Sequence, residues 1–213
     1  MKLKSTIVVA AMTAFAGAAL AAPVTVSNTT AQSILDNSTI NSTINVASGG
    51  SIAPGTLSFS IGISHTFIGD LIYTITHGST SVVLMDRPGR PPASTVPGDS
   101  SNLSDNAPLT FVGSAATLAE SIGAGCVTGD VVGQAAGCLN TIFQSDQPLS
   151  AFDGMNVLGD WVLTISDNAI GDVGRLASWS ITYDTNSVPE PTSLALMGLG
   201  LAGLVVARRR KPV

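Results

Sequence analysis

The sequence predicts an all-β protein, a jelly-roll β-sandwich flanked by an N-terminal signal peptide and a C-terminal transmembrane helix. Short runs alternate apolar and small polar residues with a period of two, the pattern of a strand that is buried on one face. Residues 24–187 are rich in Ser, Thr, Gly, Asn and β-branched residues, and no stretch sustains a helical period. Each end of the chain contains an apolar segment typical of a targeting signal, and the folded part lies between these two segments.

The predicted strands fall into two groups. The first group contains TLSFSIGISH at 56–65, LIYTITH at 71–77 and SVVLMD at 81–86, and the second contains WVLTISD at 161–167 and WSITYD at 179–184. Each run places its large apolar residues on one face, so eight or nine such strands suggest two packed sheets. Near the start, STINSTIN at 38–45 predicts one strand at a sheet edge. The Pro- and Gly-rich stretch at 87–157 predicts a long connection that serves as a binding or docking surface.

The N-terminus has the form of a secretory signal peptide. Lys2 and Lys4 precede an apolar run at 7–20, and small residues lead up to Ala21. We expect the Sec machinery to export the chain and signal peptidase to remove residues 1–21 by cleavage after Ala21.

The charge of the exported part excludes two classes of partner. Six of the nine basic residues lie in the two end segments, so the exported part keeps Arg87, Arg90 and Arg175 against the 14 acidic residues of the chain. A basic stripe that would neutralise phosphates is missing, so nucleic acid and anionic lipid surfaces are poor partners. Such an acidic exported domain either recruits Ca²⁺ or uses its charge to stay soluble.

Two cysteines, Cys126 and Cys138, occur in the chain. Export places them in an oxidising compartment, so we expect a disulfide. Closing a loop of about 13 residues stabilises a fold by roughly 3 kcal/mol on the chain-entropy argument. A metal or redox pair would need closer CxxC spacing or neighbouring histidines, and the sequence has neither.

Carboxylates near the second strand group are candidate metal ligands. Asp167 and Asp172 lie in SDNAIGDVG, and Asp160 is close by in sequence. Oxygen ligands around one turn suit Ca²⁺, although the spacing is not that of an EF-hand. Asp and Asn also populate turns because they hydrogen-bond their own backbone, which explains the same residues without a metal.

The pattern of the C-terminal segment predicts a membrane anchor. An apolar helix at 192–207, about 16 residues or roughly 24 Å long, is short for a bilayer core of about 30 Å but can cross with local thinning. A basic tail follows at 208–213, with Arg208, Arg209, Arg210 and Lys211. This cluster predicts a stop-transfer signal with the tail in the cytoplasm and the domain outside.

A Pro-Glu-Pro step precedes this helix. Pro189 and Pro191 hold the chain extended and leave Glu190 exposed just outside the membrane. The order V-P-E-P at 188–191, short apolar helix and R-R-R-K closely resembles the PEP-CTERM sorting signal of Gram-negative bacteria, here at 187–213. The resemblance implies that an exosortase recognises Pro189, Glu190 and Pro191 and removes the anchor. The released protein would then join the cell surface or the extracellular polymer matrix.

Two further stretches resemble the P domain, also called Homo B, of kexin-like and furin-like proprotein convertases and some bacterial exported proteins. They are H-T-x-x-G-D-L at 65–71, and G-D-W-x-L-x-x-x-D followed by G-x-L-x-S-W at 159–179. The resemblance spans about 46–184 and implies a β jelly roll that stabilises a neighbouring subtilisin-like serine protease and modulates its calcium dependence. We therefore expect an N-terminal strand and linker region at 22–45 and a P-domain-like sandwich at 46–186.

The sequence predicts no enzymatic activity. Nothing before Val46 is long enough for a subtilisin-type catalytic domain, and no G-x-S-x-G turn occurs. His65 and His77 lie in or at the end of strand-like runs, where a structural role is expected. We expect a noncatalytic surface or matrix protein that binds extracellular polysaccharide. The alternative is an accessory domain that docks on a separately encoded subtilisin-like serine protease.

Overall fold

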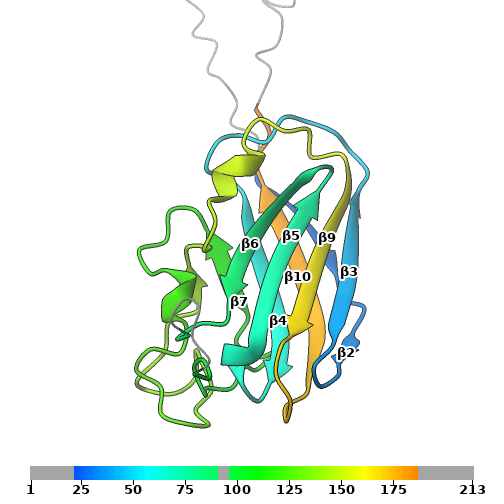
Figure 1. Ribbon diagram of the computed structural model, residues 1–213. Coiled ribbons are helices and arrows are strands. Elements are labelled where there is room, and N and C mark those ends of the chain that lie inside the picture. Colours follow the sequence, from blue (N-terminus) through cyan, green and yellow to red (C-terminus); the bar gives the residue numbers. More distant parts are fainter. Residues whose placement is uncertain (1–21, 91–95, 187–213) are drawn as a thin grey trace, which may run out of the picture. The chain divides into compact units, whose positions relative to one another are not determined.

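Ten strands build the part of the chain that the computed structural model describes, residues 22–90 and 96–186 (Figure 1). The strands are β1 (Val24–Asn28), β2 (Gln32–Ile34), β3 (Thr39–Val46), β4 (Ser58–His65), β5 (Leu71–His77), β6 (Thr80–Asp86), β7 (Leu109–Val112), β8 (Ile142–Phe143), β9 (Gly159–Asp167) and β10 (Gly174–Tyr183). Three single-turn 3₁₀ helices complete this part, η1 (Ile68–Asp70), η2 (Ala119–Ser121) and η3 (Leu149–Phe152). The prediction of an all-β fold is confirmed.

The strands form two sheets. One sheet has the order β1-β10-β4-β7-β8, with β2 also paired to β10, and the other has the order β3-β9-β5-β6. Every pair is antiparallel except β7 with β8. Figure 1 shows the four-stranded sheet lying across the face of the larger one.

Side chains from both sheets meet in a shared core. Phe59 of β4 lies 5.9 Å from Trp161 of β9 between ring centroids, and Tyr73 of β5 lies 6.3 Å from Phe111 of β7. The indole N–H of Trp179 donates across the sandwich to the Ser42 hydroxyl at 2.9 Å. Because alternate residues of each strand point inward, the period-two pattern of the sequence becomes one continuous apolar layer. The structure is therefore a two-sheet sandwich, and the finer jelly-roll order stays a prediction.

The six predicted runs all become strands, whereas the four short strands β1, β2, β7 and β8 were not predicted individually. STINSTIN becomes the edge strand β3, and the five longer runs become β4, β5, β6, β9 and β10. The stretch at 87–157, expected to be connection alone, also contains β7 and β8. Leu109 and Phe111 of β7 are fully buried, but a run of four residues is too short to stand out as periodic.

Residues 22–186 make one compact unit. Among the residues that the structure describes, no helix combines the length and the apolar character needed to cross a membrane. The helix predicted at 192–207 lies outside the described residues.

Candidate functional site

An ionic cluster occupies one end of the sandwich. It consists of His65 at the end of β4, Asp70 at the end of η1, Arg87 just after β6 and Asp167 at the end of β9. His65, Asp70 and Asp167 are 2%, 4% and 3% exposed, which is rare for titratable side chains. The antiparallel order of the strands brings these ends together, so the cluster joins residues from distant parts of the chain.

His65 and Asp167 face each other inside the cluster. The His65 Nε2 atom lies 3.4 Å from the Asp167 Oδ2 atom, and neither side chain has any exposed surface. His65 Nδ1 lies 3.2 Å from the amide nitrogen and 3.0 Å from the carbonyl oxygen of Phe67. Among the described residues, neither the His65 Nε2 atom nor the Asp167 Oδ2 atom has a hydrogen-bond partner, so the two buried polar atoms have only each other as a close polar neighbour. The pair links β4 to β9, which belong to different sheets.

Gly174 makes room for the His65 ring, and Gly69 allows a close backbone approach beside the cluster. A Cβ atom added to Gly174 would lie 2.5 Å from the His65 ring. A Cβ atom added to Gly69 would lie within 2.4 to 2.5 Å of backbone atoms of Gly98 and Asp99. Close packing therefore explains why glycine occupies the first position of G-D-L, at Gly69, and of G-x-L-x-S-W, at Gly174.

Arg87 compensates the charge of Asp70. Its Nη2 atom lies 3.4 Å from the Asp70 Oδ1 atom, and its Nε atom donates to the Gly69 carbonyl at 3.0 Å. Arg87 adopts a left-handed backbone with φ of 49°, which is uncommon outside glycine. The sequence places Asp70 in the G-D-L motif and Arg87 among the three basic residues of the exported part, but it predicts no contact between them. Asp70 directly precedes the apolar run LIYTITH, and this position could have predicted a buried carboxylate at the start of a strand.

Burial, together with the neighbouring carboxylates of Asp167 and Asp172, raises the pKa of Asp70 to about 6 against a smaller opposing effect of His65. The folded state therefore holds this proton more tightly than the unfolded chain does. Stability from this group is present at low pH and is lost as the pH rises from about 4 to about 6.

An Asp70→Asn variant tests this dependence, because asparagine keeps the shape and cannot ionise. We expect the free energy of unfolding of the variant, relative to wild type, to rise by about 2 to 3 kcal/mol between pH 4 and pH 7.5. Urea unfolding of both proteins at the two pH values measures it. A difference that does not change with pH would contradict the assignment.

The three predicted metal ligands do not come together. Asp160 and Asp167 lie near opposite ends of β9, about 23 Å apart along the strand. The Asp160 Oδ1 atom accepts a hydrogen bond from the Asn45 amide at 2.6 Å, and Asp172 accepts one from the Thr66 hydroxyl at 2.5 Å. Asp167 and Asp172 do share one end of the domain, near Asp70. One ion cannot bind Asp160 together with the other two, and Ca²⁺ stays a prediction from the sequence.

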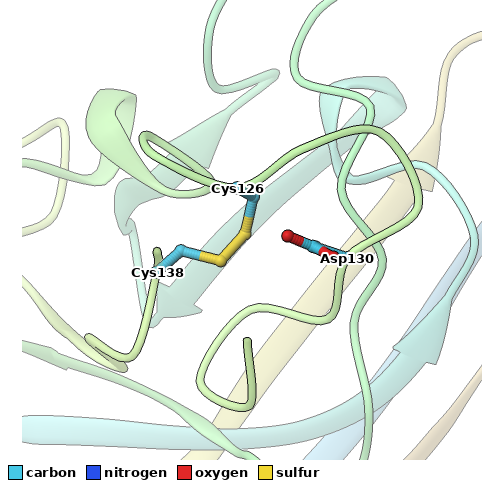
Figure 2. A group of neighbouring side chains, drawn as sticks. All are labelled: Cys126, Asp130 and Cys138. Carbon is cyan, nitrogen blue, oxygen red and sulfur yellow. A yellow bond between two sulfur atoms is a disulfide. The ribbon is translucent and has the colours of Figure 1, made fainter. Parts of the chain in front are cut away.

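The predicted disulfide between Cys126 and Cys138 is present. Figure 2 shows the Asp130 carboxylate directed at the two sulfur atoms, and ligand atoms of these three residues lie within 4.8 Å of one another. Cysteine binds metals as a thiolate, which a disulfide does not offer. Asp130 instead accepts a hydrogen bond from the Val127 amide at 3.0 Å. The group therefore holds a loop closed and is not a metal site in this oxidised state.

His77, at the opposite end of the sandwich from His65, packs against the core. Its ring stacks on Trp161 with centroids 4.1 Å apart, and its two nitrogens lie 2.9 Å and 2.8 Å from the carbonyl oxygens of Asp160 and Asn156. Among the described residues, no hydroxyl or thiol group hydrogen-bonds to His65 or His77.

The remaining predicted site residues lie outside the described residues. They are the signal cleavage residue Ala21, the motif residues Pro189, Glu190 and Pro191, and the stop-transfer residues Arg208, Arg209, Arg210 and Lys211.

A surface pocket of about 330 Å³ opens beside η3. Its lining comes from three segments, at 55–57, 113–114 and 144–153. Leu57 and Leu149 form an apolar wall, and Ser114, Gln144, Ser150 and Asp153 provide polar groups. The sequence did not predict it, because its walls come from loops far apart in the chain.

Comparison with known proteins finds one family. Residues 187–211 match the PEP-CTERM protein-sorting motif. No curated protein matches the chain.

Two solved structures resemble the chain at low similarity. The first is a crystal structure of an Aeromonas sobria serine protease in complex with its chaperone, with a TM-score of 0.41, 16% identity, and coverage of 79% of this chain and 28% of that chain. The second is a crystal structure of the Aeromonas sobria serine protease, with a TM-score of 0.39, 15% identity, and coverage of 78% of this chain and 28% of that chain. The chain thus spans less than a third of the chains that it matches. What the comparisons establish is that it carries a PEP-CTERM protein-sorting motif at residues 187–211.

Proposed function

We propose that the protein is a noncatalytic surface or matrix component that is exported by Sec, held briefly by its C-terminal anchor and released by an exosortase. The match of residues 187–211 to the PEP-CTERM sorting motif carries this proposal. The predicted signal peptide at 1–21 supports it, because a sorting signal of this kind acts on an exported chain.

The folded unit supports a noncatalytic role. Both histidines of the chain contact core or backbone groups, and the His65–Asp167 pair of the ionic cluster is closed to solvent. A general base must reach a substrate proton, and a fully buried His65 cannot do so without local opening. We infer that the unit at 22–186 binds partners through its surface rather than transforming them.

Intact-mass measurement of protein recovered from outside the cells tests the sorting proposal. We expect a product that begins at Ala22, ends near Pro191 and is lighter by two hydrogen atoms for the disulfide. A Glu190→Ala variant should keep residues 192–213 and stay with the membrane, and Glu120→Ala, an exposed carboxylate in the folded unit, should be processed normally. Wild-type protein that retains its C-terminus would contradict release by an exosortase.

A second candidate function is that of an accessory P-domain-like jelly roll that stabilises a separate serine protease. One observation favours it: the two stretches that carry the P-domain resemblance meet through His65 and Asp167. Deleting the coding sequence should then shorten the thermal half-life of secreted serine protease activity. An unchanged half-life would remove this candidate and leave the sorting proposal intact.

A further inference from the structure

The pocket beside η3 has the size and lining of a small-ligand site. Its volume of about 330 Å³ lies at the lower end of the range for ligand pockets, so it suits one small ring rather than an extended molecule. Residues 149–152 of η3 form part of one side, and the segment after β7 contributes Gly113 and Ser114.

One wall of the pocket is apolar. Leu57 and Leu149 are 2% and 4% exposed, and Pro148 lies beside them. None of the described residues that line the pocket is aromatic, so a large aromatic ligand would find no ring to stack on. The wall instead matches a ligand with one modest C–H face.

The polar side of the pocket has unused hydrogen-bonding capacity. The side chains of Ser114, Gln144 and Ser150 make no hydrogen bond to any residue that the structure describes. Asp153 uses one oxygen, which accepts from the Gly55 amide at 3.2 Å, and its other oxygen is free of described partners. Hydroxyls, an amide and a carboxylate together offer donors and several acceptors over a small area.

The charge of the lining narrows the ligand class. Asp153 is the single charged residue among the described residues that line the pocket. A carboxylate with no neighbouring cation repels anionic ligands such as uronic acids and phosphates. It accepts hydrogen bonds well from two adjacent hydroxyl groups.

We propose that this pocket binds one neutral pyranose unit of an extracellular polysaccharide. The C–H face of the sugar packs on Leu57, Pro148 and Leu149, and its hydroxyls bond to Gln144, Asp153 and the two serines. The inference deepens the proposed matrix role and rests on it for the source of the sugar.

Gly113 offers a clean way to block the pocket. Its φ is not left-handed, and an added Cβ atom would meet no atom within 4 Å, so a larger side chain fits without backbone strain. A Gly113→Phe variant places a ring at the pocket. Ser27→Phe is the matched control, because Ser27 is exposed on the edge strand β1, where an aromatic residue is tolerated.

Gln144→Leu is the second test variant. Leucine keeps the size of the side chain and removes its donor and acceptor. Because the Gln144 side chain has no bond to a described residue, the fold should keep its thermal unfolding temperature.

The experiment is a titration of the purified full chain, kept in mild detergent, followed by saturation-transfer NMR. The probes are glucose, galactose, mannose and N-acetylglucosamine, with glucuronic acid and glucosamine as charged counterparts. We expect saturable millimolar binding of at least one neutral sugar, lost in Gly113→Phe, weakened about tenfold in Gln144→Leu and unchanged in Ser27→Phe. Circular dichroism melts verify that all variants are folded.

Three outcomes would overturn the inference. They are no saturable binding of any neutral sugar, neutral-sugar binding that Gly113→Phe leaves intact, and binding of only the charged sugars. None of these outcomes affects the masses that test sorting by an exosortase, so the two proposals fail separately.

Discussion

Replacing Trp161 with alanine is expected to lower the free energy of unfolding by about 4 kcal/mol. Trp161 is fully buried, and its ring contacts Phe59, Phe152 and His77 at centroid distances of 5.9, 5.0 and 4.1 Å. The indole N–H also donates to the Val157 carbonyl at 3.0 Å. Alanine leaves a large cavity and an unpaired carbonyl, and it removes the surface on which the His77 ring stacks. Urea unfolding at neutral pH measures the loss.

A Trp161→Phe variant separates volume from hydrogen bonding. Phenylalanine keeps a stacked ring for His77 but cannot donate to Val157, so we expect a loss of about 1 to 2 kcal/mol. Equal losses for both variants would show that the cavity is not the dominant effect.

The second large effect is expected for Asp167→Ala, with a loss of about 3 kcal/mol. Removing the carboxylate leaves the Nε2 atom of His65 buried without its charged neighbour, and breaking one half of a buried pair is strongly destabilising. The Asp167 Oδ1 atom also accepts a hydrogen bond from the Ala169 amide at 3.2 Å, which supports the turn after β9. Chemical denaturation of the purified protein gives the difference from wild type.

Asp167→Asn and Asp172→Ala are the controls for this effect. Asparagine keeps one acceptor oxygen for the Ala169 amide and replaces the oxygen that faces His65 with an NH₂ group of the same size, so its loss should be about half as large. Asp172 is half-buried and bonds only Thr66 among the described residues, so its loss should stay below about 1 kcal/mol. An Asp167→Ala protein as stable as Asp172→Ala would rule out a stabilising role for the buried pair.

The sequence predicted the disulfide of the candidate site correctly but not the positions of its carboxylates. The disulfide between Cys126 and Cys138 followed from cysteine number and compartment, because two cysteines allow one pairing. The grouping of Asp160 with Asp167 and Asp172 did not hold, since seven residues of extended strand separate two of them by most of the length of a sheet. Proximity in sequence is a poor guide to proximity in space wherever a strand intervenes.

Asp70 and Arg87 are distant in sequence but lie close together in space. They are 17 residues apart, and their charges meet because η1 ends beside the turn that follows β6. Nothing in the local pattern of either residue carries this information. The pKa of Asp70, which burial raises to about 6, is a property of the assembled cluster and not of the motif in which it occurs.

The sequence by itself determined the longer strands, the disulfide and the sorting motif. Each depends on information local to a segment: the alternation of Phe59, Ile61 and Ile63, the number of cysteines, and the order of residues at 187–211. Only the tertiary structure decided the ionic cluster, the contact between Trp161 and His77, and the pocket beside η3. These features form where strand ends and loops from distant segments converge, and that convergence is set by sheet order, which a period-two pattern does not encode.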